Sequence, residues 1–237
     1  MKQPLTSVWT REARPAKSPT LSRAQIVRAA MELLDAEGMD ALSMRRLGGK
    51  LGAGATSIYW HVANKDELLE LVLDEVFGEI PLPDLEVTNW RDAASVFAYG
   101  VRQVLFAHPW STVLIGSMPT LGPNAMRLSA GLMNTFKMAG FEGMALDRAS
   151  STLMAYVLGS TTPEITWRTI VDSAGMSAPE MVAAMAETME QAAGDYPDLL
   201  ARYKEYENVD QNTASALNFD FGLTCFLDGL QARLKQS

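Results

Sequence analysis

Three side chains that could contact a polyanion, Tyr59, Trp60 and His61, are consecutive in the sequence. Each ring joins an apolar body to a polar tip, which suits contact with sugars, phosphates and thymine methyl groups. Lys65 follows four residues later, and a helix that starts near Asn64 would add backbone N–H groups that attract phosphate. These residue types, at this spacing, indicate a surface that binds nucleic acid.

Helix signals show which elements would position these residues. Ser22 with Gln25, and Asn64 with Glu67, have the spacing of capping boxes. Each pair precedes apolar residues at helical spacing, and the first pattern stops at Gly38. The apolar positions are Ile26, Ala30, Leu33 and Leu34 in the first helix and Leu69, Val72, Leu73, Val76 and Phe77 in the later one.

Two short helices are expected between these two. Ser43 can cap the first, which extends to about Leu51, residues 52–54 form a tight turn, and a helix of about two turns covers residues 55–61. Short helices separated by a glycine-containing turn have the shape of a helix-turn-helix. In that motif the third helix lies in the major groove of DNA. The small residues at 55–57 would let it approach the bases closely.

A competing interpretation places Tyr59 and Trp60 in the core of this small domain. Adjacent residues on a helix diverge by about 100°, so both rings cannot point inward, and Ile58 is the better core candidate. We therefore expect Tyr59 and Trp60 to be exposed for contact with DNA. Arg45, in the first turn of the second helix, could reach a guanine edge or the backbone.

The charge of the chain is divided unevenly. The net charge of -8 combines +5 over residues 1–65 with −13 over the remainder. A basic amino-terminal part on an acidic body suggests a module that binds a polyanion, although a solvated basic tail would give the same asymmetry. Residues 1–20, with Pro4, Pro15 and Pro19 and several cations, are expected to form a flexible basic arm.

Composition limits the classes of protein to which the chain could belong. A hydrophobic share of 48% over 237 residues allows a sizeable core. The single cysteine, Cys225, leaves no intramolecular disulfide and no cysteine-cluster metal site, which fits a reducing cytosol. No apolar run approaches the roughly 20 residues that span a bilayer, and the start lacks the apolar stretch of a signal peptide. We expect a cytoplasmic protein with no membrane contact, no cofactor and no metal.

Helical patterns without β-type alternation predict an all-α fold. We expect a helix-turn-helix domain over residues 21–66 and a larger helical ligand-binding and dimerisation domain over residues 67–237. Pro163 is expected to kink or end a helix. The helices expected in the larger domain span residues 90–107, 110–117, 123–139, 145–173, 178–193, 196–207 and 212–235.

The larger domain offers candidates for an adaptable pocket that takes a flat hydrophobic ligand. For each, ordinary core packing is the alternative. Glu164 and Arg168, at i and i+4, could be only a surface pair, and His108 is as well explained by capping or by the core edge as by a ligand. The pocket candidates are Phe97, Trp110, Met118, Phe136, Tyr156 and Trp167.

The last helix is apolar on two sides, so it must be covered on two sides. Together with the small residues of the segment 145–160, this favours a two-fold helical dimer interface, with Gly222 and Gly229 allowing close approach. A central helix buried within one subunit is the alternative. One face holds Phe219, Leu223, Phe226, Leu227, Leu230 and Leu234, and the other holds Leu217, Phe221 and Cys225.

Residues 21–77 resemble the DNA-binding domain of the TetR family of bacterial transcriptional regulators. The segment YWHVANKDELL, from Tyr59 to Leu69, is the most specific part, and its wording is similar to the tetracycline repressor branch. The segment NFDFGLTCFLDGLQARL and the AHPW of Ala107 to Trp110 resemble the ligand-binding body of that branch.

This resemblance implies a homodimeric repressor that binds a pseudo-palindromic operator in double-stranded DNA. A small hydrophobic effector, such as a polycyclic natural product, would release it, and the helix near Asn64 would transmit the signal. The alternative is a sequence-specific regulator controlled by a protein partner. By position, the implied base contacts are Arg45, Ala55, Thr56, Ser57, Tyr59, Trp60 and His61, with Ser43 and Lys65 on phosphates.

Tetracycline itself is not the expected effector. The tetracycline repressor holds a magnesium–drug chelate with histidines of its body, and the corresponding positions here are Pro81 and Leu114. Neither side chain can replace an imidazole as a metal ligand. An enzyme is not expected either, because the sequence has no phosphate-binding Gly-Lys loop, no nucleophile elbow and no His/Cys/Asp cluster at ligand spacing.

Overall fold

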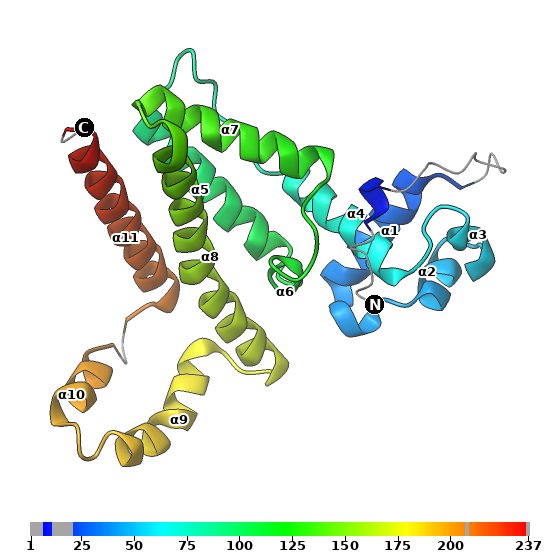
Figure 1. Cartoon of the computed structure of the whole chain (residues 1–237). Helices are drawn as coiled ribbons and strands as arrows, with labels where there is room; N and C mark the ends of the chain where they lie inside the picture. The colour runs from blue at the N-terminus through cyan, green and yellow to red at the C-terminus, as the bar shows by residue number, and fades with distance from the viewer. Residues whose placement is uncertain (1–6, 11–20, 207–208, 236–237) are drawn as a thin grey trace, which may run out of the picture. The chain divides into compact units, whose positions relative to one another are not determined.

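The computed structural model describes residues 7–10, 21–206 and 209–235 (Figure 1). Within these residues every regular element is a helix, so the all-α prediction is confirmed. The chain divides into two compact units, Met1–Ser151 and Thr152–Ser237. The boundary expected between residues 66 and 67, which would separate the helix-turn-helix domain from the ligand-binding domain, stays a prediction.

The first half of unit 1 contains the helices expected for a helix-turn-helix. Ser22 caps α1 in a complete capping box with Gln25, and Ser43 caps α2 by accepting the backbone N–H of Arg46. Their apolar faces meet in a core that includes Ile26, Leu47 and Ile58. The bounds are α1 Arg23–Glu37, α2 Met44–Lys50, α3 Ala55–Tyr59 and α4 Lys65–Gly78, with 3-10 turns at Val8–Thr10 and Met39–Ala41.

The second half of unit 1 contains α5 (Trp90–Ala107), α6 (Ser111–Leu114) and α7 (Pro123–Ala139). The helix α4 packs against α1 on one side and against α7 on the other, and α7 also packs against α5 (Figure 1). This helix therefore joins the helix-turn-helix to the helices that follow it in the same unit.

Two buried carboxylates fix α4 in this position. Glu70 accepts hydrogen bonds from the Ser7 hydroxyl (2.5 Å) and the Val8 backbone N–H (3.2 Å). Residues 7–10 belong to the segment expected to be a flexible arm, but here they pack against α4, while residues 1–6 and 11–20 of that arm lie outside the described residues.

One turn further along α4, Asp74 caps another helix. Gly122, the N-cap residue of α7, has no side chain, and the Asp74 carboxylate accepts the N–H groups of Asn124 (3.2 Å) and Ala125 (2.9 Å) instead. A Cβ at residue 122 would lie 2.2 Å from the Asp74 carboxylate, so glycine is required for this close approach. At the C-terminal end of α4, just beyond Asp74, Arg127 donates to the carbonyl oxygens of residues 77, 78 and 80.

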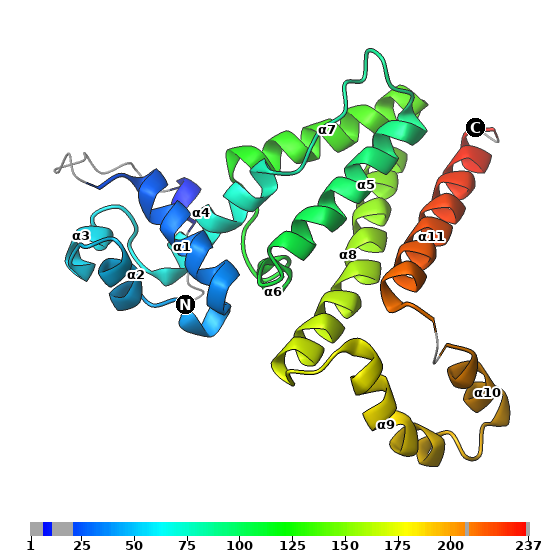
Figure 2. The ribbon, with the colours of Figure 1, turned by 180° about the vertical axis from the view of Figure 1, so that it is seen from behind.

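Unit 2 contains most of α8 (Gly143–Ser173), with α9 (Ala178–Ala192), α10 (Pro197–Tyr206) and α11 (Gln211–Leu234). Figures 1 and 2 both show α11 running beside α8. The Tyr156 hydroxyl of α8 donates to the carbonyl oxygen of Phe219 (2.6 Å), and a Cβ at Gly222 would lie 2.6 Å from that hydroxyl. Gly222 thus allows close approach of α8 within the chain, whereas no atom lies within 4 Å of a Cβ built at Gly229.

The expected helices and the observed ones differ at several places. The helix expected over residues 110–117 is limited to α6, Ser111–Leu114, and α8 begins two residues before the expected residue 145. The third helix ends at Tyr59 rather than residue 61, because the chain passes into a turn at Trp60. Pro163 does not end a helix, since α8 continues through it to Ser173. The helices expected over residues 90–107, 123–139 and 178–193 agree with the structure to within a residue.

Replacing Asp74 tests whether this carboxylate holds α7 on α4. We expect Asp74→Ala to lower the free energy of unfolding by about 1–3 kcal/mol, because it leaves buried N–H groups without an acceptor. Urea unfolding followed by circular dichroism, at equal protein concentrations, measures this change. The control is Glu75→Ala, an exposed acid on the same helix; equal effects of the two variants would contradict the cap.

Candidate DNA-binding surface and ligand cleft

The short helix α3 is anchored by one side chain and exposes its neighbours. Ile58 is fully buried at 0% exposure, while Tyr59 is 44% and Trp60 55% exposed. Ile58 was the expected core residue, and that prediction is confirmed. Thr56 and Ser57 are exposed as well, and His61 is half-buried.

The turn before α3 depends on glycine. Gly52 has φ +61°, in the left-handed region where a side chain would strain the backbone. Gly54 then precedes α3 as its N-cap residue in extended conformation. The turn sets the direction of α3 after α2, and the two helices pack against each other.

The basic residues near α3 are held in different ways. Arg46 pairs with Glu37 (2.6 Å) and Lys50 with Glu32 (2.9 Å), so both are engaged with α1. Arg45 is exposed. Lys65 is half-buried, and its ammonium group donates to the Met39 carbonyl oxygen at 3.5 Å.

A second polar cluster connects α1 to the turn after α5. His108 is buried, and its Nδ1 lies 2.7 Å from Asp35 Oδ1 while its Nε2 lies 3.0 Å from Glu79 Oε2. Trp110 Nε1 donates to the same Asp35 oxygen at 2.7 Å. Because carboxylates only accept hydrogen bonds, both nitrogens donate only when the ring is protonated. His108 is therefore a core-edge residue that joins three segments of unit 1.

The titration of His108 follows from this setting. Burial lowers the pKa of the ring, but the hydrogen bonds and charges of Asp35 and Glu79 outweigh it, so that the pKa of His108 is raised above its usual value. The imidazolium form is thus favoured in the folded protein.

Unit 2 contains a cleft of about 1090 Å³ among residues of α8 to α11. Four aromatic side chains line it: Tyr156, Trp167, Tyr203 and Phe219. Its volume is slightly above the range of about 300–1,000 Å³ that is typical of small-molecule sites. The cleft can therefore hold a flat aromatic molecule.

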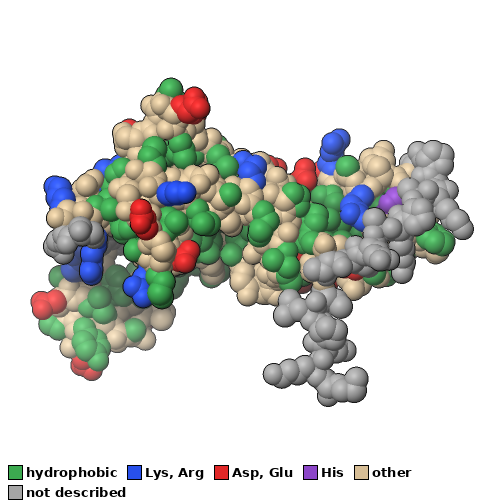
Figure 3. Space-filling view, turned by 45° about the horizontal axis from the view of Figure 1, so that its top comes forward, with side chains coloured by type: hydrophobic (Ala, Val, Ile, Leu, Met, Phe, Trp, Pro, Cys, Tyr) green, Lys and Arg blue, Asp and Glu red, His purple; other side chains and the backbone are tan. Residues whose placement is uncertain are grey.

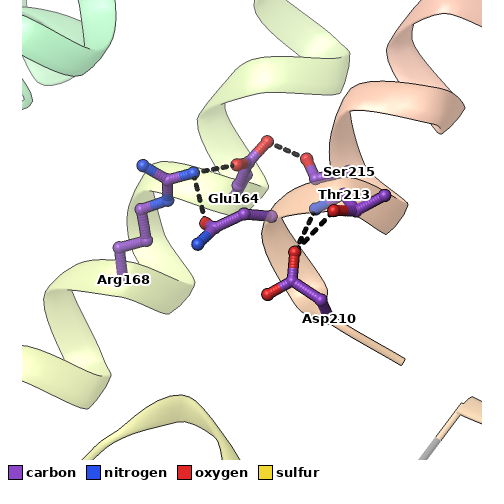
Figure 4. Close-up of polar contacts among 6 residues, drawn as sticks. Glu164, Arg168, Asp210, Thr213 and Ser215 are labelled. Atoms are coloured by element: carbon purple, nitrogen blue, oxygen red, sulfur yellow. Dashed lines mark hydrogen bonds and ion pairs between the residues drawn. The ribbon is translucent and has the colours of Figure 1, made fainter. Parts of the chain in front are cut away.

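A polar network of residues that line the cleft connects α8 to α11 (Figure 4). Glu164 Oε1 pairs with Arg168 (2.6 Å), and the other Glu164 oxygen accepts the Ser215 hydroxyl of α11. Arg168 also donates to Asn212 (2.9 Å). The sequence offered the two residues as a surface pair at i and i+4. In the structure they join α8 to α11, a partnership that spacing along one helix cannot reveal.

The six residues proposed from sequence for a ligand pocket fall into separate places. Tyr156 and Trp167 line the cleft of unit 2. In unit 1, Phe97 and Phe136 are buried in the core, Met118 is half-buried after α6, and Trp110 binds Asp35. Two of the six therefore line this cleft and four belong to unit 1, so a pocket that includes all six stays a prediction. The sequence reasoning missed the polar residues of the cleft.

Pro81 and Leu114, which stand at the positions of the metal-binding histidines in the tetracycline repressor, differ in exposure: Pro81 is exposed and Leu114 is buried. The Pro81 ring packs against α5, where a Cβ at Gly100 would be 2.7 Å away, and Leu114 is buried. The expectation that no magnesium-chelated tetracycline binds stays a prediction. None of the helices in the described residues has the length and hydrophobicity needed to cross a lipid bilayer.

A helix-turn-helix with exposed aromatic side chains at and just after the end of α3, carried with a larger helical region, is the architecture of DNA-binding transcriptional regulators. Residues 26–72 match the family profile described as bacterial regulatory proteins, tetR family, and residues 82–234 match the tetracyclin repressor-like C-terminal domain. The chain belongs to the TetR family.

Two curated relatives carry similar descriptions. An HTH-type transcriptional regulator of Saccharopolyspora erythraea is 39% identical over 198 residues, covering 83% of this chain and 81% of that protein. The HTH-type transcriptional repressor DrrR1 of Streptomyces coeruleorubidus is 31% identical, covering 98% of this chain and 86% of its own length.

Among solved structures, apo ActR of Streptomyces coelicolor is 28% identical, with a TM-score of 0.75 over 92% of this chain and 99% of its own. ActR has also been solved in complex with actinorhodin, and that structure has a TM-score of 0.74, 28% identity and coverage of 90% of this chain and 98% of ActR. Relatives named as regulators or repressors are consistent with a protein that is not an enzyme.

The raised pKa of His108 gives a pH-dependent prediction. The stabilising contribution of a group with a raised folded pKa is complete below its unfolded pKa, about 6.5 for His, and is lost as the pH rises through the folded pKa. We expect His108→Gln to lower the free energy of unfolding by about 1–3 kcal/mol at mildly acidic pH, and by less at alkaline pH.

Urea unfolding of the wild type and the variant at both pH values measures this difference. His61→Gln is the control, because it replaces the only other histidine without touching the cluster. A His108→Gln effect that is the same at both pH values would contradict the role of the imidazolium.

Proposed function

We propose that the chain is a homodimeric repressor that binds a pseudo-palindromic operator and is released by a small hydrophobic effector. The observation that carries this proposal is the pair of exposed aromatic side chains, Tyr59 and Trp60, beside the fully buried Ile58. Large exposed rings on a small domain favour a binding surface over packing. Tyr59 ends α3 and Trp60 follows it directly, and α3 corresponds to the element that enters the major groove in helix-turn-helix proteins.

The remaining DNA contacts follow from position on this surface. The exposed side chains of Thr56 and Ser57 are the proposed base contacts beside the two rings, and exposed Arg45 reaches a base edge or the backbone. Ser43 and Lys65, at the starts of α2 and α4, are proposed phosphate contacts, because backbone N–H groups at helix starts attract phosphate. Ala55 and His61 complete the proposed set.

Two exposed faces in unit 2 support a dimer. On α11, Leu217 is 62% and Phe221 73% exposed, on the side away from buried Phe219 and Leu223. On α8, Ala155, Gly159 and the residues that follow at helical spacing are exposed as well. Figure 3 shows further hydrophobic side chains exposed between polar ones. A second copy related by two-fold symmetry would cover the α8 and α11 faces.

Release by an effector requires that the ligand binds the form unable to hold DNA more tightly than the competent form. The aromatic cleft of unit 2 is the proposed ligand site. The helix α4 is the proposed transmitter, because it packs against both α1 and α7. A ligand bound by the ActR relative, actinorhodin, supports the idea that a polycyclic compound is the effector.

Removing one exposed ring tests the DNA surface. We expect Tyr59→Ala to weaken binding to the operator about ten- to hundredfold, as loss of a base or backbone contact typically does, without changing the free energy of unfolding by more than about 0.5 kcal/mol. Fluorescence anisotropy on DNA flanking the gene measures affinity. Tyr99→Ala is the control, because Tyr99 on α5 is equally exposed at 44%; equal losses in both variants would contradict the assignment.

The ligand response is tested on the same DNA with a panel of flat hydrophobic natural products, at two salt concentrations. We expect one compound class to abolish site-selective binding while the protein remains a dimer by sedimentation. Selective binding that no compound weakens would argue against release by a small molecule and for control by a protein partner.

A further inference from the structure

The cleft of unit 2 has an uneven charge. Among the described residues that line it, the charged side chains are Glu164, Arg168, Asp172 and Asp210, so three negative groups face one positive group. The surrounding wall is made of aromatic side chains and of apolar ones such as Val171 and Val182. A ligand in the cleft therefore meets both π surfaces and a net negative charge.

The single positive charge is already matched. Glu164, Arg168 and Asp172 lie one turn apart along α8, so that Arg168 could pair with either acid. It pairs with Glu164 (2.6 Å) and also donates to Asn212 (Figure 4). Because Glu164 is 12% exposed and also accepts the Ser215 hydroxyl, this arrangement fixes the guanidinium away from the role of an anion receptor.

The two other acids of the cleft, Asp210 and Asp172, are not paired with Arg168. Asp210 caps α11 by accepting the Thr213 hydroxyl (2.6 Å) and N–H (2.8 Å), and these hydrogen bonds lower the pKa of Asp210. Asp172 is exposed, and no lysine or arginine of the described residues forms an ion pair with it. Both carboxylates are thus available to attract a cation at neutral pH.

Aromatic side chains favour the same kind of ligand. A cation within about 6 Å of a ring face is attracted by the ring's negative face, and Trp167 and Tyr203 line the same cleft as Asp172. A flat ring system stacks on these side chains, while a protonated amine on that ring system lies near the carboxylates. An acidic aromatic compound would meet repulsion at the same place.

We infer that the cleft of unit 2 selects flat aromatic ligands that carry a protonated amine and discriminates against those that carry a carboxylate. This assignment rests on the proposed function only in that it names the chemical class of the effector. Binding of a ligand to the cleft is measured without DNA. The inferred selectivity and the proposed repressor function can therefore fail separately.

Three fluorescent probes of one shape test the inference: anthracenylmethylamine, anthracenylmethanol and anthracenecarboxylate, which are cationic, neutral and anionic at neutral pH. Their anisotropy is titrated with the full chain. We expect the amine to bind about tenfold more tightly than the carboxylate, with the alcohol between them, as one or two partly exposed charges typically produce. Equal affinities, or a preference for the carboxylate, would overturn the inference.

Two variants separate charge from stacking. Asp172→Asn should lower affinity for the amine about three- to fivefold and leave the alcohol unchanged, whereas Asp195→Asn, an exposed acid of unit 2 that does not line the cleft, should change neither. Trp167→Leu should weaken all three probes by a similar factor of about ten, because it removes the stacking surface. An Asp172→Asn effect on all three probes alike would overturn the charge selection.

Two results distinguish this inference from the proposed function. Binding that prefers the amine but leaves DNA affinity unchanged would count against effector release and leave the selectivity of the cleft in place. Failure of all three probes to bind a protein that still binds its operator would overturn the cleft as a ligand site.

Discussion

The structure of unit 1 depends on two carboxylates buried one turn apart in α4. Glu70 and Asp74 are 4% and 5% exposed, and a buried charge is tolerated only when hydrogen bonds replace its water. Each obtains them from a different segment: Glu70 from residues 7 and 8, and Asp74 from the start of α7. If α4 slid or rotated, one of these carboxylates would lose its hydrogen-bond donors. The two carboxylates therefore give the helix a defined position.

The His108 cluster adds a second connection between the helix-turn-helix and the rest of unit 1. Asp35 belongs to α1, and Glu79 follows α4 directly, so both segments converge on one imidazolium. If α4 changes position, the hydrogen bonds of this cluster and those of Asp74 must all be kept or replaced. Such a network has few alternative arrangements, which suits a switch between two discrete states better than gradual bending.

The distribution of charge separates the two proposed binding partners. The proposed DNA contacts lie in the part of the chain with a net charge of +5, residues 1–65, whereas the remainder has a net charge of −13, which would repel phosphate. The same acidic character continues into the cleft of unit 2, where Asp172 and Asp210 face aromatic side chains. The two proposed binding partners, a polyanion and a cationic aromatic molecule, thus correspond to parts of the chain with opposite net charge.

The sequence determined what depends on local order: helix positions from apolar spacing, the Ser22 capping box, the burial of Ile58 and the membership of the helix-turn-helix. These follow from neighbours three or four residues apart. Contacts between distant residues were decided only by the tertiary structure. The partners of Glu70, Asp74 and His108 lie between 29 and 73 residues away along the chain, and no periodicity encodes them. The cleft, likewise, exists only because α8 and α11 bring Trp167 and Asp210 together, so the residue types were visible in the sequence but their shared site was not.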